Sequence, residues 1–272
     1  MRRGPERPRP TGEGTGPAWI AGVHPVHEAL LAAPAGVREV LVAREAEAKR
    51  LAPIREAAAA AGVPVSLRDR AELSRILGHD RHQGVAARLR GLPGYVALED
   101  LLSRVEADRA AGRPALLVLL DGIVDPQNLG AIIRSAEGAG AQGVIIPKDR
   151  AAGLSAAVVR ASAGAVYHLP VARVTNLVAA MATLAARGIW TVGTVAPGPG
   201  VGERAQVYHE ADLAGDLALV IGAEGRGLRR LVAERCDLLV TIPLHGRVGS
   251  LNASAAAAVL LFEARRQRAA GG

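Results

Sequence analysis

The clearest fold signal in this chain lies in LALVIGAEGRGLRRLVAERCDLLVTIPLHGRVGSLNASAAAAVLLF, residues 217–262. Two short runs in it, residues 217–221 and 238–242, are rich in Leu, Val and Ile, which is the composition of buried parallel strands. Each run is followed by a polar loop that contains glycine and leads into a helical segment. In an open α/β sheet, ligands bind beyond the carboxyl ends of the strands. We therefore expect a cofactor to lie across these two loops.

The same alternation of apolar strand and helix recurs upstream. A continuous apolar run at 116–120 predicts one more strand. Further strands are predicted near Val144, Val166 and Thr191, and helices near Ala156, Leu177 and Leu228. Repeated βα units of this kind predict an α/β fold with a mostly parallel sheet and helices on both faces.

Composition divides the chain into four parts. Residues 1–17 are rich in Pro, Gly and Arg, which predicts a disordered basic tail. Residues 18–90 predict a small α/β domain, 91–113 a linker with a helix at 98–110, and 114–268 a larger domain. In the small domain we expect helices at 25–31, up to 61 and at 69–76, the last capped by Asp69, and strands at 39–42, 63–67 and 85–89.

Charge and cysteine content restrict the class of protein. The net charge of +7 and the isoelectric point of about 10.6 favour a polyanionic partner such as nucleic acid. Cys236 is the only cysteine, so the chain has no internal disulfide framework and no cysteine cluster for zinc. It has neither an apolar stretch long enough for a membrane span nor an apolar signal core at its N-terminus, so we expect a cytosolic protein without a membrane partner.

Common nucleotide-site motifs are absent. No G-x-G-x-x-G follows a first strand, and no G-K-[ST] occurs, which argues against a Rossmann dinucleotide site and a P-loop. The loop 79–84 contains two histidines but no regular ligand spacing, so we predict contact with RNA phosphate there rather than a metal. The polar residues at the predicted strand ends could together hold a ribose, a phosphate and a small cofactor; they are Asn128, Arg134, Glu224, Ser250, Asn252 and Ser254.

Three ordered motifs resemble those of the SpoU (TrmH) family of S-adenosylmethionine-dependent RNA ribose 2'-O-methyltransferases. They are DPQNLGAIIR at 125–134, IGAEGRGL at 221–228, and IP at 242–243 followed by SLNAS at 250–254. The resemblance covers roughly residues 116–266, and residues 18–90 are similar to the substrate-binding domain of many members. It implies a SPOUT-type domain with a deep trefoil knot, a homodimer that packs near the knot, and an enzyme without a metal. The run 253–258, rich in Ala, would suit either the dimer contact or the core.

The resemblance also implies roles for individual residues. The match places Asn128, Arg134, Glu224, Ser250 and Asn252 in the catalytic site, with Asn128 orienting Arg134 or the ribose and Glu224 binding substrate or holding Arg134. A guanidinium is effectively never deprotonated in proteins, so we expect Arg134 to clamp phosphate and stabilise the forming alkoxide rather than to act as the base. Cofactor contacts are implied at Thr194, Val195, Ala196, Gly222, Ile242 and Leu251. Arg226, Arg229 and Arg247 lie in the same loops and are candidates for contact with RNA phosphates.

The reaction implied is methyl transfer to the ribose 2'-hydroxyl of a guanosine in 23S rRNA. Three alternatives stay open: a tRNA ribose methyltransferase, a resistance enzyme that methylates an adenosine of 23S rRNA, and an RNA-binding protein without catalysis. The additional N-terminal domain favours rRNA over tRNA.

Overall fold

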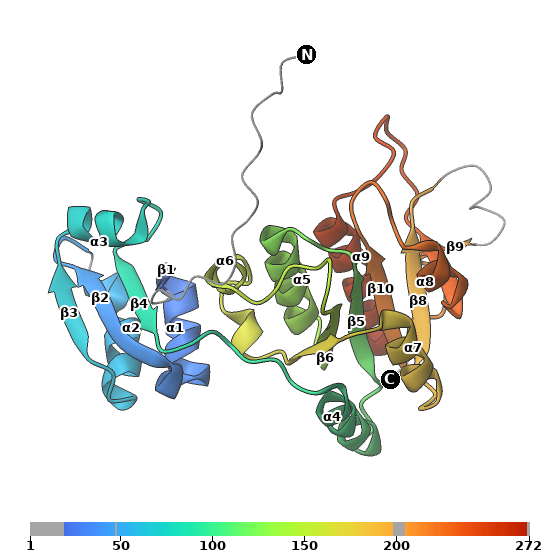
Figure 1. Ribbon diagram of the computed structural model, residues 1–272, viewed down its shortest axis with the longest axis horizontal. Helices are drawn as coiled ribbons and strands as arrows, with labels where there is room; N and C mark the ends of the chain where they lie inside the picture. Colours follow the sequence, from blue (N-terminus) through green and yellow to red (C-terminus); the bar gives the residue numbers. More distant parts are fainter. Residues whose placement is uncertain (1–18, 47, 198–204, 271–272) are drawn as a thin grey trace, which may run out of the picture.

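The computed structural model describes residues 19–46, 48–197 and 205–270, and the predicted N-terminal tail lies outside them. The described chain is built on two separate sheets, one from residues 19–89 and one from residues 116–241 (Figure 1). We call the parts built on them the small domain and the large domain. No helix among the described residues is both long enough and apolar enough to cross a membrane.

The small domain has a four-stranded mixed sheet with the strand order β1-β4-β2-β3. β1 and β2 run antiparallel to β4, whereas β2 and β3 are parallel. Its elements are β1 (Trp19–Ala21), α1 (Val23–Ala32), a 3-10 helix (Pro34–Gly36), β2 (Val37–Ala43), α2 (Ala48–Ala60), β3 (Val65–Arg68), α3 (Arg70–Leu77) and β4 (Val85–Leu89). The predicted ends of these elements agree to within about two residues, but β1 was not predicted.

The large domain has a seven-stranded sheet with the order β7-β6-β5-β10-β8-β11-β9, in which every pair of neighbours is parallel. Its elements are α4 (Leu98–Ala110), β5 (Leu116–Asp121), α5 (Pro126–Gly138), β6 (Gly143–Pro147), α6 (Ala156–Ala161), the 3-10 helix η2 (Ala165–Tyr167), β7 (Val171–Val174), α7 (Leu177–Ala185), β8 (Trp190–Val195), β9 (Ala205–Val207), β10 (Leu217–Gly222), α8 (Arg230–Glu234), β11 (Leu238–Thr241) and α9 (Ala253–Ala270). The predicted parallel α/β fold is confirmed.

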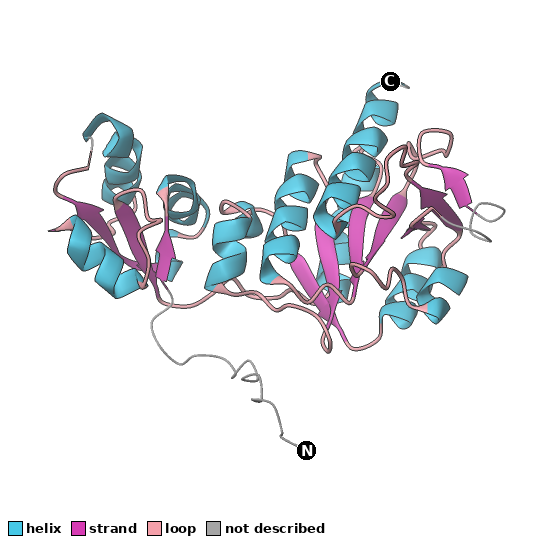
Figure 2. Ribbon diagram, turned by 90° about the horizontal axis from the view of Figure 1, so that it is seen from above, coloured by secondary structure: helices cyan, strands magenta, loops and turns pink. Residues whose placement is uncertain are grey.

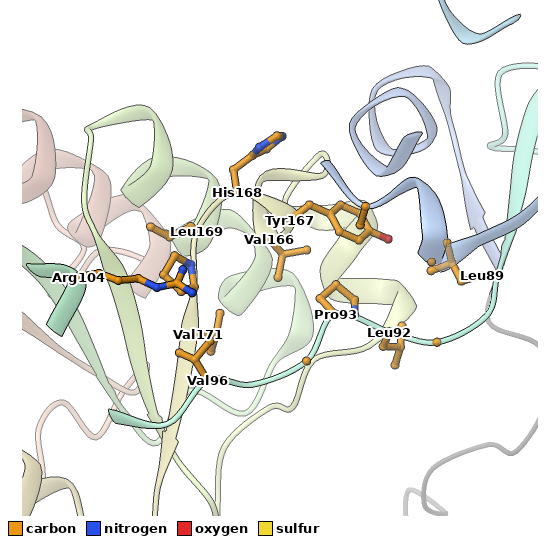
Figure 3. Close-up of a pocket in the computed structure, with 15 residues that line it drawn as sticks. Leu89, Leu92, Pro93, Val96, Arg104, Val166, Tyr167, His168, Leu169 and Val171 are labelled. Carbon is orange, nitrogen blue, oxygen red and sulfur yellow. The ribbon is translucent and has the colours of Figure 1, made fainter. Parts of the chain in front are cut away.

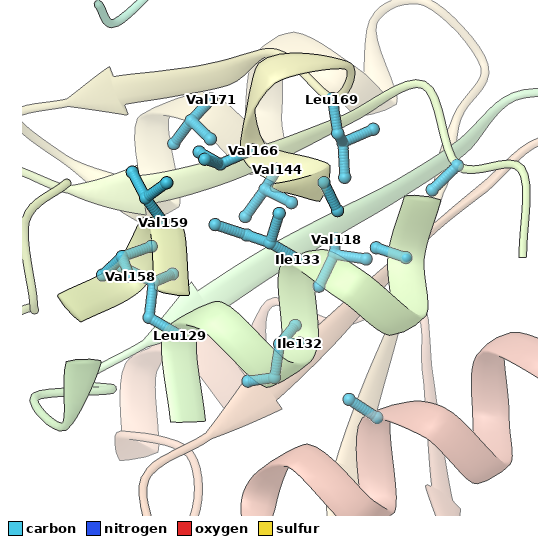
Figure 4. Close-up of a cluster of buried hydrophobic side chains, with 14 of the residues drawn as sticks. Val118, Leu129, Ile132, Ile133, Val144, Val158, Val159, Val166, Leu169 and Val171 are labelled. Carbon is cyan, nitrogen blue, oxygen red and sulfur yellow. The ribbon is translucent and has the colours of Figure 1, made fainter. Parts of the chain in front are cut away.

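Helices cover both faces of the large sheet (Figure 2). Every residue of β5 and β10 is buried, as expected for strands in the middle of a parallel sheet. On one face, side chains of α5 such as Leu129 and Ile133 pack against Val118 of β5 and Val144 of β6 (Figure 4). On the other face, α4 and α7 pack their leucines against the same strands. Because β5 and β10 are fixed from both sides, the loops at their carboxyl ends start from rigid positions.

Two predictions in the fold were wrong. Val166 lies in η2 rather than in a strand, because Gly164 takes a left-handed backbone at φ 92° and turns the chain before β7 begins. Val166 is buried all the same, so its apolar signal reported burial and not strand geometry. Asp69 stands at the N-cap position of α3, but its carboxylate forms no capping hydrogen bond and instead lies 3.3 Å from Arg44.

The two domains are in contact through α1 and η2. Glu28 of α1 and His168 are joined by a hydrogen bond, with Oε2 and Nε2 2.7 Å apart. A cavity of about 300 Å³ opens beside this contact, between the linker residues Leu92 and Pro93 and the segment around Tyr167 (Figure 3). The Tyr167 hydroxyl is buried without a hydrogen-bond partner in the described chain, and burial raises the pKa of Tyr167 to about 12. The small domain therefore adjoins the large sheet on the side of β6 and β7.

Candidate active site

The candidate site lies at the carboxyl edge of the large sheet, where three loops meet. They follow β5, β10 and β11 and comprise residues 122–125, 223–229 and 242–252. β5 and β10 are hydrogen-bonded neighbours, and their last residues, Asp121 and Gly222, are paired in register. Because parallel strands end at the same edge, residues far apart in the sequence come together here.

Three of the predicted residues form one hydrogen-bonded group. Asn128 Nδ2 donates to Glu224 Oε1 at 3.0 Å, and Asn252 Nδ2 donates to Asn128 Oδ1 at 3.0 Å. Asn252 Nδ2 also donates to Glu224 Oε1. We call Asn128, Glu224 and Asn252 the polar trio. Its members come from α5, from the loop after β10 and from the segment before α9, so the trio holds three chain segments together.

Asn252 has a second role at the start of α9. Its Oδ1 accepts hydrogen bonds from the backbone N–H of Ser254 at 2.9 Å and from the Ser254 hydroxyl at 2.6 Å. This is the geometry of a helix N-cap. One Asn252 amide thus caps α9 with its oxygen and binds the trio with its nitrogen. Asn128 itself is not a cap, because Asp125 caps α5 through a 2.9 Å hydrogen bond to the Gln127 N–H.

The loop that carries Glu224 is closed on itself. Ala223 and Gly227 exchange two backbone hydrogen bonds, of 3.1 and 2.8 Å, so Glu224 stands in a tight turn. The backbone of Gly227 and Leu228 packs directly on Gly222, where a Cβ atom would lie 2.3 Å from the Gly227 carbonyl carbon. Gly222 is therefore required by the close approach of two backbone segments.

Asp121 is a further site residue that the sequence analysis missed. Its side chain is completely buried, and its carboxylate accepts hydrogen bonds from Arg229, from Nε at 2.6 Å and from the backbone N–H at 2.8 Å. The pair ties the end of β5 to the end of the Glu224 loop. Asp121 holds only Nε of the Arg229 guanidinium, and 56% of the side chain is exposed, so contact of Arg229 with RNA phosphate stays a prediction. A carboxylate that ends an otherwise apolar strand is the sequence signal that could have identified Asp121.

A cavity of about 270 Å³ lies between the loops after β10 and β11 and the carboxyl end of β8. All six predicted cofactor residues line it: Thr194, Val195, Ala196, Gly222, Ile242 and Leu251. Glu224 and Ser250 line it as well, so one member of the trio faces the cavity. Its walls combine backbone at Gly222 with the apolar side chains of Ile242 and Leu251, which is the kind of lining that binds the faces and edge of a purine.

Arg134 is not brought to the trio within one chain. It follows Asn128 by six residues on α5, which at about 100° per residue turns it to another side of the helix. Its side chain is exposed and forms no ion pair or side-chain hydrogen bond with any described residue. Glu224 binds Asn128 and Asn252, so within the single chain neither Asn128 nor Glu224 holds Arg134. The alternatives, in which Asn128 orients the ribose and Glu224 binds the substrate, stay predictions.

In the loop 79–84 of the small domain, His82 has a structural role. This side chain is fully buried, where its ring nitrogens lie 3.1 Å from Ser74 Oγ and from the Gly84 N–H. Burial, with a contribution from Arg70, lowers the pKa of His82 below its usual value. His82 is therefore unable to reach RNA phosphate, whereas Arg81 of the same loop is exposed, so RNA contact by the rest of the loop stays a prediction. The described residues contain no cluster of three or more His, Cys, Asp or Glu side chains that could hold a metal.

Comparison with known proteins gives two matching sequence profiles. Residues 115–262 match the SpoU rRNA Methylase family, and residues 19–94 match the profile described as RNA 2'-O ribose methyltransferase substrate binding. The chain is 46% identical over 211 residues to the 23S rRNA (guanosine-2'-O-)-methyltransferase RlmB of Ralstonia nicotianae, which covers 78% of this chain and 80% of the relative. It is 43% identical to the enzyme of the same name from Coxiella burnetii, over 92% of this chain and 96% of the relative.

Solved structures resemble the whole described architecture. The SpoU methyltransferase AviRb from Streptomyces viridochromogenes, in complex with the cofactor AdoMet, superposes with a TM-score of 0.70 at 29% identity. The superposition covers 93% of this chain and 91% of that one. An AdoMet-bound rRNA methyltransferase from Sinorhizobium meliloti gives a TM-score of 0.69 at 28% identity, over 92% of this chain and 87% of that one.

Proposed function

The chain belongs to the SpoU rRNA methylase family, and from this premise we propose that it transfers a methyl group from S-adenosylmethionine to the ribose 2'-hydroxyl of a guanosine in 23S rRNA. The observation that carries the proposal is the polar trio at the edge of the lined cavity, since Glu224 belongs to both. Relatives that share 40% identity or more over most of the chain bear this activity in their names.

The cavity residues fit the cofactor. Ile242 and Leu251 would cover the faces of the adenine with apolar walls, and backbone groups beside Gly222 would meet its edge. Thr194, which also lines the cavity, is held in place because its hydroxyl donates a hydrogen bond to the Val220 carbonyl of β10 at 3.2 Å. When bound there, S-adenosylmethionine supplies an electrophilic methyl group on its sulfonium.

The trio positions the acceptor ribose. Glu224 Oε1 is engaged by the two asparagine amides, whereas Oε2 has no hydrogen-bond partner within the described ranges. Oε2 accepts a hydrogen bond from the ribose and so fixes the direction of the 2'-oxygen. Holding the oxygen in line with the methyl group supplies much of the rate enhancement for a displacement of this kind. Ser250, at the cavity wall, offers its hydroxyl to the same region.

A second copy of the chain completes the site. Arg134 lies away from the trio of its own chain, and Arg134 of the partner subunit clamps the RNA phosphate and stabilises the developing negative charge. Exposed apolar side chains support a homodimer; Val124, Val248 and Leu251 lie in the loops of the site, and Phe262 lies further along α9. In the run 253–258, Ala253 and Ala257 pack into the core and Ala255 is exposed, so the run serves core and interface together.

The remaining predictions follow from the same proposal. Residues 18–90 bind the rRNA, residues 91–113 connect the two domains, and residues 114–268 carry out the methyl transfer. A ribosomal RNA substrate places the enzyme in the cytoplasm. The trefoil knot stays a prediction of the family resemblance.

The test is transfer of tritium from labelled S-adenosylmethionine to unmodified 23S rRNA and to bulk tRNA in parallel, followed by mapping of the labelled nucleotide. We expect label at a guanosine 2'-oxygen of 23S rRNA. Label at an adenosine would identify the resistance-type activity, and label in tRNA the tRNA activity. Cofactor binding with no transfer to either RNA, or to ribosome precursors, would leave an RNA-binding protein without catalysis.

A further inference from the structure

The loop after β6, residues 148–155, lies between the small domain and the candidate active site. β6 is the neighbour of β5, so this loop stands at the same sheet edge as the trio. It touches the loop that leads to Asn128, because the Ala152 N–H donates to the Ile123 carbonyl at 2.7 Å. It continues into α6, which packs against β1 of the small domain (Figure 1).

The loop carries exposed cations without acidic partners. Lys148, Arg150 and, further along on α6, Arg160 are exposed and form no ion pair with any described residue. Asp149 is the one acid among them, and it too is exposed. By contrast, many other arginines of the large domain are neutralised; Arg109, Arg113, Arg187, Arg229, Arg230 and Arg266 all pair with carboxylates. Lys148 and Arg150 therefore leave unpaired positive charge on this loop, as Arg134, Arg235 and Arg265 do elsewhere in the described large domain.

The loop is also held in a fixed shape. The Leu154 N–H donates to the Tyr95 hydroxyl at 2.8 Å, and Arg173 donates to the Lys148 carbonyl at 3.0 Å while its guanidinium stacks on the Tyr95 ring. Arg150 has a left-handed backbone with φ 56°, which is unfavourable for a residue with a side chain. A conformation of this kind persists because the surrounding contacts impose it. Since Tyr95 belongs to the linker, the loop is anchored to the connection between the domains.

We infer that Lys148 and Arg150 form a basic ledge that binds the phosphate backbone of the RNA substrate between the small domain and the active site. The inference rests on the proposed function and adds a binding surface to it. An RNA that contacts both domains has to cross the carboxyl end of β6, because the small domain adjoins the sheet on that side and the trio lies beyond β5. Cations along that route neutralise phosphates and release counterions, so they contribute affinity without sequence preference.

The ledge is tested with the double variant Lys148→Ala/Arg150→Ala in the full chain. The matched control is Arg235→Ala/Arg265→Ala, which removes the same charge from two exposed arginines, likewise unpaired in the described chain, toward the amino-terminal edge of the sheet. Binding of unmodified 23S rRNA is measured by filter retention between about 50 and 200 mM salt, the range in which phosphate contacts dominate the change. Calorimetry with S-adenosylmethionine, without RNA, checks that each variant keeps the cofactor site.

We expect the ledge variant to bind the rRNA more weakly and to lose about 1.4 to 1.8 from the slope of log affinity against log salt, the change for two phosphate contacts. The control variant should keep the slope of the unchanged protein. Equal slopes for the ledge variant and the unchanged protein would contradict RNA binding by the ledge. An equal loss of slope in the control variant would contradict it as well. Failure of the proposed function is seen separately, as absence of tritium transfer by the unchanged protein.

Discussion

Asp121 and Arg229 form a salt bridge between the end of β5 and the end of the loop that presents Glu224, with the carboxylate buried and the guanidinium partly exposed. Oδ1 accepts from Arg229 Nε at 2.6 Å, and Oδ2 accepts from the Arg229 backbone N–H at 2.8 Å. The two residues are 108 positions apart. The salt bridge fixes both ends of the turn, because Gly222 at its start is paired with Asp121 in the sheet.

Replacing Asp121 with Asn removes the charge but keeps the shape of the side chain. We expect the free energy of unfolding to fall by about 1.5–3 kcal/mol, the usual value for hydrogen bonds to a charged group. Methyl transfer should fall as well, because the Glu224 turn loses its anchor. Arg230→Ala is the matched control, since its pair with Glu234 is on the surface and contributes about 0–0.5 kcal/mol. Urea unfolding and initial rates measure both effects; equal losses in the two variants would contradict the anchoring role.

Asn252 offers a way to separate helix capping from the trio. Asn252→Asp keeps the oxygen that accepts from Ser254 and adds negative charge at a helix N-terminus, which is favourable there. It loses the amide that donates to Glu224 and brings two carboxylates together. We therefore expect a melting temperature close to that of the unchanged protein and a large loss of kcat. Asn252→Ala should lose about 1 kcal/mol of stability in addition, as caps usually contribute. Retained activity in Asn252→Asp would remove the trio from the mechanism.

Gly222 is predicted to tolerate no side chain. In Gly222→Val the Cβ would collide with the backbone of Gly227 and Leu228, so the Glu224 turn has to move and distort the cavity. The affinity for S-adenosylmethionine, measured by calorimetry, should fall strongly. Gly215→Ala is the control, because a Cβ there meets no atom within 4 Å. Unchanged cofactor affinity in Gly222→Val would disprove this placement of the cofactor.

Arg134→Ala is predicted to abolish methyl transfer while the dimer and cofactor binding persist. The proposed dimer adds a sharper test, in which Arg134→Ala and Asn128→Ala subunits are unfolded together and refolded in equal amounts. If each site combines Asn128 of one chain with Arg134 of the other, mixed dimers contain one intact site and about a quarter of the full activity returns. Activity recovered to that level with neither parent active supports the shared site; no recovery places Arg134 within one chain.

His82 predicts how stability depends on pH. Burial lowers its pKa in the folded chain, so between that lowered value and the ordinary value of about 6.5 the unfolded chain binds more protons. Stability contributed by neutral His82 is therefore lost as the pH falls below about 6.5. Urea unfolding at pH 7.5 and 5.5 should show this loss, and His82→Gln should reduce the difference between the two pH values. The exposed His24, which forms no side-chain hydrogen bond with any described residue, is replaced by Gln as the control and should leave the difference unchanged.

The sequence by itself determined the parallel α/β fold and the place of the site. Apolar runs such as those of β5 and β10, each followed by a polar loop with glycine, are typical of strands buried on both faces, and parallel strands put their carboxyl ends at one edge. Glu224 and Asn252 follow two of these strands in polar loops with glycine, so their meeting at that edge was predictable. The lining of the cavity by Gly222, Ile242 and Leu251 was predictable for the same reason, once the motifs were matched.

Only the tertiary structure decided which polar groups bind one another. Asp121 with Arg229, and Asn128 with Glu224 and Asn252, are separated by so many residues that no local pattern specifies the partner. Arg134 shows the converse, because a motif shared with Asn128 does not place the two side chains together on a helix. Val166 was misassigned for a related reason: burial and strand geometry give the same apolar signal, and the left-handed turn at Gly164 decides between them. Hydrophobic periodicity records which residues leave water, whereas hydrogen bonding depends on distances of a few tenths of an ångström that packing alone sets.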